Sequence, residues 1–349
     1  MTIHRYTPFA FGLHTLCDLK SVSMLSGLLS LLIVSSLLPI VPVRAETQTS
    51  SVGSNVSCPV GAEPFGIAFD SSNGYMYVAD EGSNAVSVLA APCNVIDTII
   101  LGPVGFPNDF YLVFDQVNGY VYVSEGNPSS VIIIQNTTII ANITRGVSNP
   151  SYLAADPVSG RVFVVESNDR IAVIRNTRVV DIIRGVSPSS GPIVYGSATQ
   201  DMYLAGNSQR NDTWEINIIG TTCTCVTGQF SVKGAVSAMG YDPTIGYLYV
   251  THVHVGADKL GLIEAFNTIT DESVGSLTVA HNGPQGVGFD PNDNEIYISM
   301  DRQRDVIVMN NLSIVDSIPV AQSPRDLAYS PINHMMYVTL FKNTVQLIS

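Results

Sequence analysis

One short phrase recurs seven times along the chain, and this repetition restricts the fold more than any other feature of the sequence. Each copy holds an apolar run, a turn, and a second apolar run with an aromatic residue at its centre. The central aromatic residues are Tyr77, Tyr122, Phe163, Tyr203, Tyr249, Tyr297 and Tyr337. They lie 40 to 48 residues apart, which is the length of one four-stranded blade of a β-propeller. The spacing therefore predicts an all-β, seven-bladed propeller of four-stranded antiparallel blades.

The first repeat shows how one period divides into strands. Its four strands are predicted at residues 66–70, 75–79, 85–90 and 95–101. Asn73-Gly74 joins the first two as a hairpin turn. The seventh repeat offers only three strands before Ser349. We expect residues 55–60 to supply its fourth strand and close the ring, because closure removes exposed sheet edges.

The N-terminal segment lies outside the repeats. Residues 24–43 form an uncharged, mostly apolar run, and Val43-Arg44-Ala45 follows it as a site of the kind that signal peptidase cleaves. The run is also long enough to anchor the chain in a bilayer. We therefore predict that residues 1–45 are a signal peptide or an N-terminal anchor and that residues 46–349 are a single propeller domain. The protein is expected to be secreted or at the cell surface, with membrane contact only if the leader stays uncleaved.

Charge and composition limit the partners. The 349 residues include 29 acidic and 16 basic side chains, which give a formal net charge of −13. Binding to phosphate backbones requires clustered Lys and Arg, so no nucleic-acid partner is expected. Hydrophobic residues make up 46% of the chain, which excludes wholesale disorder.

An exported chain can hold disulfides and glycans. Beyond the leader there are four cysteines, Cys58, Cys93, Cys223 and Cys225, and the sequence does not choose among their three pairings. The last two form a C-x-C, which suits a local disulfide, two inert thiols or, on a strand, a soft metal. The N-x-S/T sequons are at Asn55, Asn136, Asn142, Asn211 and Asn311, so the chain is a candidate glycoprotein.

The repeated phrase resembles the YVTN-type β-propeller repeat, which occurs in YncE-like periplasmic proteins and in archaeal surface-layer propellers. Thr251 and Thr339 follow Tyr-Val as in the family's Tyr-Val-Thr-Asn, and residues 306–320 resemble its next two strands. The resemblance covers residues 55–349. No copy keeps the family's Asn, because the fourth positions hold Asp80, Glu125, Glu166, Gly206, His252, Met300 and Leu340. The resemblance implies an exported propeller and leaves its ligand open.

In a propeller, the loops between the second and third strands and the loops between blades open on one face, where ligands usually bind. Six polar residues are predicted to lie on this face: Asp80, Asp109, Glu125, Glu166, Gln285 and Arg325. Together with Glu81, the acids of the first three blades form a candidate Ca²⁺ site, because Ca²⁺ takes six to eight oxygen ligands. A solvated acidic rim is the plainer interpretation of the same pattern.

Three histidines form a second candidate metal site. His252 and His254 leave one strand of the fifth blade on the same side, and His281 follows on a loop of that blade. Three imidazoles near one point would suit Zn²⁺ or Cu²⁺. Exposed loop imidazoles are the simpler alternative.

We predict from these features a non-catalytic, extracytoplasmic binding platform. Its partner would be a protein, a glycan or a small ligand on the face just described, and no cofactor is required. The first alternative is a metal-dependent hydrolase or lyase of the lactonase-like propeller type, using the acids or the histidines. The second is a structural surface-layer component. No nucleophile elbow, P-loop, H-E-x-x-H or dinucleotide fingerprint occurs in the chain.

Overall fold

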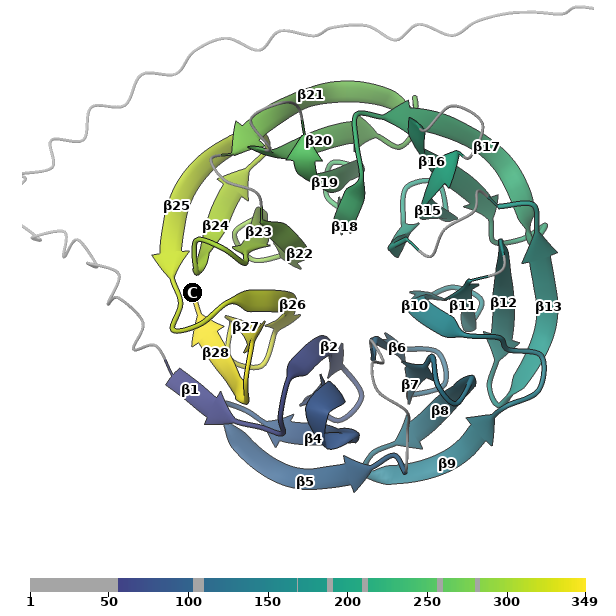
Figure 1. Cartoon of the computed structure of the whole chain (residues 1–349), viewed down its shortest axis with the longest axis vertical. Helices are drawn as coiled ribbons and strands as arrows, with labels where there is room; N and C mark the ends of the chain where they lie inside the picture. Colours follow the sequence, from purple (N-terminus) through teal and green to yellow (C-terminus); the bar gives the residue numbers. More distant parts are fainter. Residues whose placement is uncertain are drawn as a thin grey trace, which may run out of the picture. The chain divides into compact units, whose positions relative to one another are not determined.

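The computed structural model describes residues 56–102, 110–167, 169–186, 191–208, 213–255, 260–279 and 283–349. Within these ranges the chain forms seven four-stranded antiparallel sheets that stand around a common axis as the blades of a propeller (Figure 1). The predicted fold class is confirmed. The one helical element in the described residues is the 3₁₀ turn η1 (Glu81–Ser83).

The strands take four places in the blades, from the axis outward. The innermost strands are β2 (Pro64–Asp70), β6 (Leu112–Asp115), β10 (Pro150–Asp156), β14 (Ile193–Gly196), β18 (Val236–Asp242), β22 (Pro284–Asp290) and β26 (Pro324–Ser330). The second strands are β3 (Tyr75–Asp80), β7 (Tyr120–Glu125), β11 (Arg161–Glu166), β15 (Asp201–Ser208), β19 (Tyr247–Val255), β23 (Glu295–Met300) and β27 (Met335–Leu340). The third strands are β4 (Ala85–Ala90), β8 (Ser130–Gln135), β12 (Arg170–Arg175), β16 (Thr213–Gly220), β20 (Leu260–Asn267), β24 (Asp305–Asn310) and β28 (Thr344–Ile348). The outermost strands are β5 (Asn94–Ile100), β9 (Thr138–Ile143), β13 (Arg178–Arg184), β17 (Cys225–Val232), β21 (Glu272–Val279), β25 (Ser313–Pro319) and β1 (Val56–Pro59).

The Asp that ends most innermost strands forms the turn into the second strand. In the first blade, the Asp70 carboxylate accepts hydrogen bonds from the Ser72 amide (2.7 Å) and the Ser72 hydroxyl (2.6 Å). Asp115 accepts from the Val117 amide in the same way (2.9 Å). Such side-chain contacts replace the backbone bonds that a turn leaves unmade. The local turn chemistry therefore explains why five of the seven innermost strands end in an acid.

The last blade is made from both ends of the chain. β1 pairs antiparallel with β28, from Val56 opposite Leu347 to Pro59 opposite Thr344. A disulfide joins Cys58 of β1 to Cys93, in the turn between β4 and β5 of the first blade. The second disulfide, between Cys223 and Cys225, closes a turn within the fourth blade. Of the three pairings that the sequence allowed, the structure therefore contains Cys58–Cys93 with Cys223–Cys225.

The hydrophobic core lies between the blades. Each of its clusters draws side chains from two adjacent blades: Tyr77 and Val88 of the first blade, for example, pack with Val123 and Ile132 of the second. A further cluster joins the seventh blade to the first through Tyr337, Leu347 and Val78. Neighbouring blades therefore hold one another in position around the axis. No helix in the described part of the chain has the length and apolar character needed to span a bilayer.

Candidate functional site

Five of the seven innermost strands, β2, β10, β18, β22 and β26, contain bulges that redirect side chains. Their pairing with the second strands is interrupted near the start of the strand, at Pro64/Ile67, Pro150/Leu153, Val236/Ala238, Pro284/Val287 and Pro324/Leu327. A bulge breaks the strict alternation of a strand and changes the direction of its side chains. Two consecutive residues of one strand, such as Arg325 and Asp326, therefore both border the central space.

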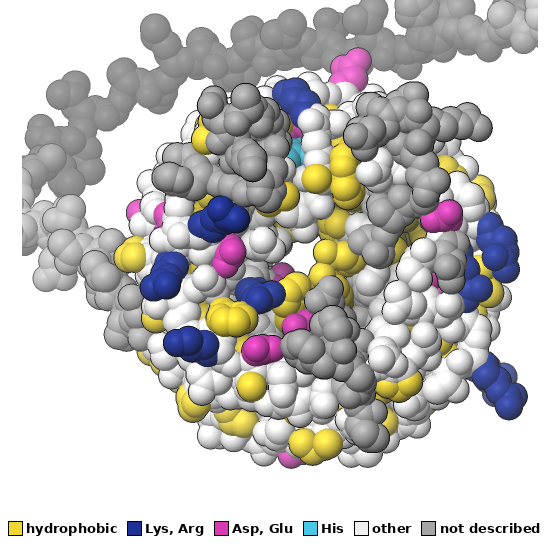
Figure 2. Space-filling view, in the orientation of Figure 1, with side chains coloured by type: hydrophobic (Ala, Val, Ile, Leu, Met, Phe, Trp, Pro, Cys, Tyr) yellow, Lys and Arg dark blue, Asp and Glu magenta, His cyan; other side chains and the backbone are white. Residues whose placement is uncertain are grey.

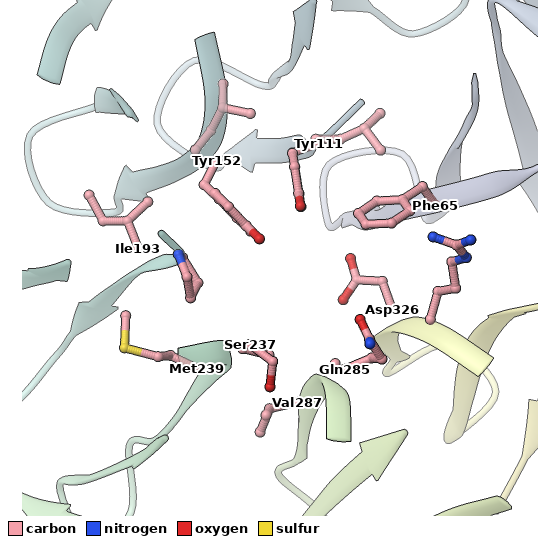
Figure 3. Close-up of a pocket in the computed structure, with 15 residues that line it drawn as sticks. Phe65, Tyr111, Tyr152, Ile193, Ser237, Met239, Gln285, Val287 and Asp326 are labelled. Atoms are coloured by element: carbon pink, nitrogen blue, oxygen red, sulfur yellow. The ribbon is translucent and has the colours of Figure 1, made fainter. Parts of the chain in front are cut away.

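That central space is a cavity of about 160 Å³. It is bordered by Phe65, Tyr111, Leu112, Tyr152, Leu153, Pro192, Ile193, Ser237, Ala238, Met239, Gln285, Gly286, Val287, Arg325 and Asp326. Every blade contributes to this set, and Figure 3 shows the labelled side chains around the open volume. The volume is close to the ~150 Å³ of an engineered protein cavity that holds one benzene molecule. It therefore suits a small ligand. Figure 2 shows the hollow at the centre of the ring, with hydrophobic side chains along its border.

Three aromatic rings form one wall of the cavity. The rings of Phe65 and Tyr111 meet edge to face, with centroids 5.1 Å apart and an interplanar angle of 87°. The Tyr111 and Tyr152 rings lie 4.0 Å apart at 35°. Both tyrosine hydroxyl groups are directed towards the middle of the cavity (Figure 3). The wall thus offers apolar ring surface together with polar oxygen atoms.

Asp326 places a carboxylate at the edge of the cavity beside this wall (Figure 3). Its Oδ1 accepts a hydrogen bond from the Leu327 amide (2.9 Å), and its Oδ2 accepts one from the Ile67 amide of the first blade (3.2 Å). Burial raises the pKa of Asp326 to about 6, and the two amides partly counter this effect. Because this pKa lies below 7, the charged form of the carboxylate is favoured at neutral pH. Within the described residues, no basic side chain forms an ion pair with it.

Gln285 and Arg325, two of the residues predicted for the ligand face, border the cavity. The Arg325 guanidinium lies over the ring of Phe65 at 5.0 Å and over the ring of Phe341 at 5.2 Å. Cations are attracted to the faces of aromatic rings at such distances. These contacts hold the guanidinium between the two rings.

Hydroxyl groups from the second strands fix the backbone of the cavity wall. The Thr339 hydroxyl donates to the Phe65 carbonyl (2.8 Å), and the Ser299 hydroxyl donates to the Arg325 carbonyl (2.5 Å). Each of these bonds joins one blade to the next. Both donors occupy the third position of the repeated phrase, where Thr251 also lies. The Thr-like position of the repeat therefore holds the innermost strand of the following blade.

Close approach of the innermost strands also explains a glycine of the cavity wall. A Cβ atom on Gly286 would lie 2.4 Å from the Arg325 carbonyl oxygen and 3.0 Å from the Asp326 Cα. Both neighbours are backbone atoms, which cannot move aside at low cost. The glycine thus allows β22 and β26 to lie side by side at the cavity.

The predicted acidic residues Asp80, Glu125 and Glu166 are buried at the ends of their second strands. The Ser87 hydroxyl donates to Asp80 (2.6 Å), and the Ser130 hydroxyl donates to Glu125. Glu166 pairs with Arg170 and accepts from the Ser148 amide. Burial raises the pKa of Asp80 to about 6 and also raises the pKa of Glu125. The three carboxylates therefore have partners within the fold and do not border the central cavity.

The Ca²⁺ hypothesis for these acids stays a prediction. Of its other two members, Asp109 lies outside the described residues, and the Glu81 carboxylate accepts a hydrogen bond from the Phe110 amide (3.0 Å). Within the described residues, no three His, Cys, Asp or Glu side chains are grouped so that they would hold a metal ion.

His252 is fully buried in the fifth blade, and both of its ring nitrogens face protein atoms. Its Nδ1 lies 3.0 Å from the Gly234 carbonyl oxygen, and its Nε2 lies 3.0 Å from Glu264 Oε2. The Lys233 amide donates to the same carboxylate (3.0 Å). Burial alone would raise the pKa of Glu264, but the contacts with His252 and Lys233 outweigh it and lower the pKa. The side chain of His254 and the whole of His281 lie outside the described residues, so the Zn²⁺ or Cu²⁺ site stays a prediction.

The sequence reasoning missed Tyr111, Tyr152 and Asp326. Each lies four residues before the end of its innermost strand, at Asp115, Asp156 and Ser330 respectively. Counting back from the strand-ending residue would have found all three. The prediction instead selected the residue directly after the loop proline, as at Gln285 and Arg325.

The fold and the cavity together define the class: a seven-bladed β-propeller with a small, aromatic and polar pocket on its axis. No protein-family model matches the chain, and no curated protein matches it. Among solved structures, the chain is similar to one from Kuenenia stuttgartiensis hydrazine synthase, with a TM-score of 0.72 and 15% sequence identity. The match covers 85% of this chain and 98% of that chain. At this identity the likeness extends to the propeller fold alone.

Proposed function

We propose that this chain is an exported, YVTN-type propeller that recognises a small ligand in its central pocket without transforming it. The observation that carries the proposal is the pocket itself, where all seven blades supply side chains around about 160 Å³. Pockets that combine apolar walls with a few convergent polar groups are typical ligand sites. Here the Tyr111 and Tyr152 rings supply the apolar surface, and Asp326 and Gln285 supply the polar groups.

The pocket is preorganised, which suits recognition. The carbonyl groups of Phe65 and Arg325 are held by hydroxyl groups of neighbouring blades, and the Asp326 carboxylate is held by two amides. A wall fixed before binding loses little conformational entropy when a ligand enters. A ring in which each blade braces the next is therefore a suitable support for a small, rigid site.

Export is supported by the apolar segment at residues 24–43 and by the two disulfides. Disulfides persist in oxidising compartments outside the cytosol. Membership of the YVTN-type group is supported by the Tyr-Val-Thr phrases at Thr251 and Thr339. It is also supported by the Thr339 hydroxyl, which joins the seventh blade to the first.

A thermal-shift screen tests the proposal. Neutral sugars, amino acids, organic cations and organic anions would each be added to the purified protein and to its Tyr152→Ala variant. We expect one chemical class to raise the melting temperature of the unaltered protein and to lose most of this effect in the variant, because the ring forms part of the pocket wall. No shift with any class, or equal shifts in both proteins, would contradict a ligand site in the pocket.

The metal-dependent alternative has its own test. Elemental mass spectrometry would be applied to the protein and to a His252→Ala/His254→Ala variant. About one Zn or Cu per chain that disappears in the variant would replace the recognition proposal with a metal-dependent hydrolase or lyase.

A further inference from the structure

We infer that the ligand of the central pocket is a small organic cation, of the primary or quaternary ammonium class, held between the Asp326 carboxylate and the Tyr111–Tyr152 wall. This inference rests on the proposed function and specifies the chemistry of its ligand.

The first argument is the charge of Asp326. Its carboxylate borders the cavity, remains partly exposed there, and has no ion-pair partner among the described residues. Its two amide contacts are neutral and occupy one acceptor site on each oxygen, whereas a carboxylate offers about four such sites. A negative charge in a partly dry pocket is stabilised by a positive partner, and none of the described side chains forms an ion pair with this carboxylate.

The second argument is the aromatic wall. The Tyr111 and Tyr152 rings lie 4.0 Å apart, and both hydroxyl groups point into the same volume as the carboxylate (Figure 3). A phenolic oxygen carries the negative end of its bond dipoles and accepts hydrogen bonds, so two such oxygens aimed at one volume favour a positively charged ligand beside the carboxylate. A neutral ligand would gain the ring contact and would leave the carboxylate without a counter-ion.

A positive charge, the Arg325 guanidinium, borders the same cavity. It lies between the rings of Phe65 and Phe341, at 5.0 and 5.2 Å from their centroids, and makes no ion pair with the adjacent Asp326. Because these two rings hold it, the guanidinium does not neutralise the carboxylate. An anionic ligand would have to approach Arg325 while lying beside the Asp326 charge, which disfavours that class.

Matched ligands test the inference by isothermal titration calorimetry on the purified protein. The probes are tetramethylammonium, choline and 3,3-dimethyl-1-butanol, the neutral carbon isostere of choline. We expect a cation to bind at least ten-fold more tightly than the isostere. We also expect Asp326→Asn to weaken cation binding at least ten-fold, because the amide keeps the shape of the side chain and loses its charge. The exposed Asp316→Asn serves as the control and should leave binding unchanged.

Each other outcome has a definite meaning. Equal binding of choline and its isostere, or cation binding that Asp326→Asn and Tyr152→Ala both leave intact, would overturn the inference. If the cations do not bind but a neutral or anionic class from the thermal-shift screen does, the inference of a cationic ligand is wrong. The proposal of a recognition pocket then still holds. If no class binds, the proposed function fails as well. If Asp326→Asn does not fold, the comparison of choline with its neutral isostere on the unaltered protein still tests the inference.

Discussion

At the scale of single residues, the tyrosine of the repeat joins adjacent blades. The hydroxyl of Tyr77 donates to the Asn136 carbonyl of the next blade (2.7 Å), and the hydroxyl of Tyr122 donates to the Asn176 carbonyl (2.9 Å). Tyr337 makes the same kind of bond to Pro92, across the point where the ring closes (2.8 Å). The ring fills the core between the blades while the hydroxyl satisfies a turn carbonyl. The tyrosine side chain therefore contributes both apolar packing and a hydrogen bond between blades.

This role predicts a difference between two conservative substitutions. Tyr122→Phe removes the donor to the Asn176 carbonyl, so we expect the free energy of unfolding to fall by about 1 kcal/mol. Tyr249→Phe is the matched control, because the Tyr249 hydroxyl is buried and has no hydrogen-bond partner in the described part of the chain. Removing the Tyr249 hydroxyl should leave the free energy of unfolding unchanged or raise it slightly. Urea unfolding measures both, and equal losses in the two variants would contradict the role assigned to the hydroxyl.

A buried acid predicts a dependence of stability on pH. The Oδ2 of Asp80 accepts from Ser87, while its Oδ1 is buried and has no hydrogen-bond partner in the described residues. Burial raises its pKa to about 6. The folded state therefore holds the proton more tightly than the unfolded chain does. The contribution of Asp80 to the free energy of unfolding must then fall as the pH rises from about 4 to about 6.

Asp80→Asn tests this dependence because it removes the titrating group and keeps the size of the side chain. Between pH 4 and pH 7, the stability of the variant relative to the unaltered protein should improve by about 2–3 kcal/mol, from the pKa shift. Chemical denaturation at several pH values measures the difference. A constant difference across this range would show that Asp80 does not titrate there.

At the scale of elements, the strand that completes the last blade is tied to the first blade. β1 contains Cys58, whose disulfide to Cys93 links residues 35 positions apart. A cross-link of this span restricts the unfolded chain considerably, whereas the Cys223–Cys225 bond, with a separation of 2, restricts it little. The first disulfide therefore secures the contact between the outer edges of the seventh and first blades.

Removing each disulfide separately tests this contrast. A Cys58→Ala/Cys93→Ala variant should lose about 2–4 kcal/mol of stability, and its amides at residues 56–59 should exchange hydrogen faster. A Cys223→Ala/Cys225→Ala variant should change much less, because the loop that it opens is so short. Similar losses in the two variants would contradict the role of the longer cross-link.

At the scale of the whole molecule, the ring of blades determines where a ligand can meet side chains from distant parts of the sequence. Phe65 and Arg325 lie 260 positions apart, and the guanidinium of one lies over the ring of the other because the seventh blade is beside the first. Asp326 likewise accepts from the Ile67 amide across the same junction. The pocket thus depends on ring closure.

The proposed export also belongs to this scale, because cleavage of the leader would set the N-terminus of the folded chain. Expressed in a host with a secretory pathway, the protein should appear outside the cytoplasm with its mature chain beginning at Glu46, after the Val43-Arg44-Ala45 site. Intact-mass measurement gives the new N-terminus directly. A full-length chain in the membrane fraction would instead show an uncleaved anchor.

The sequence by itself determined the blades, their number and their turns. The period of the repeat, the aromatic residue at the centre of each second strand and the Asp at the end of most innermost strands are local features, and local hydrogen bonds and packing fix them. These features do not depend on which blades are neighbours in the ring. The loop prolines likewise led to the prediction that Gln285 and Arg325 lie on the ligand face, and both residues border the cavity.

Only the tertiary structure decided which side chains share the pocket and which cysteines pair. Tyr111, Tyr152 and Asp326 meet because strands far apart in the sequence converge on one axis, and because bulges in several of them interrupt the alternation that a sequence pattern assumes. Burial of Asp80, Glu125 and Glu166 follows in the same way from the packing of whole blades. Cys58 meets Cys93 because the last blade is completed beside the first. These are consequences of long-range packing, on which the local pattern carries no information.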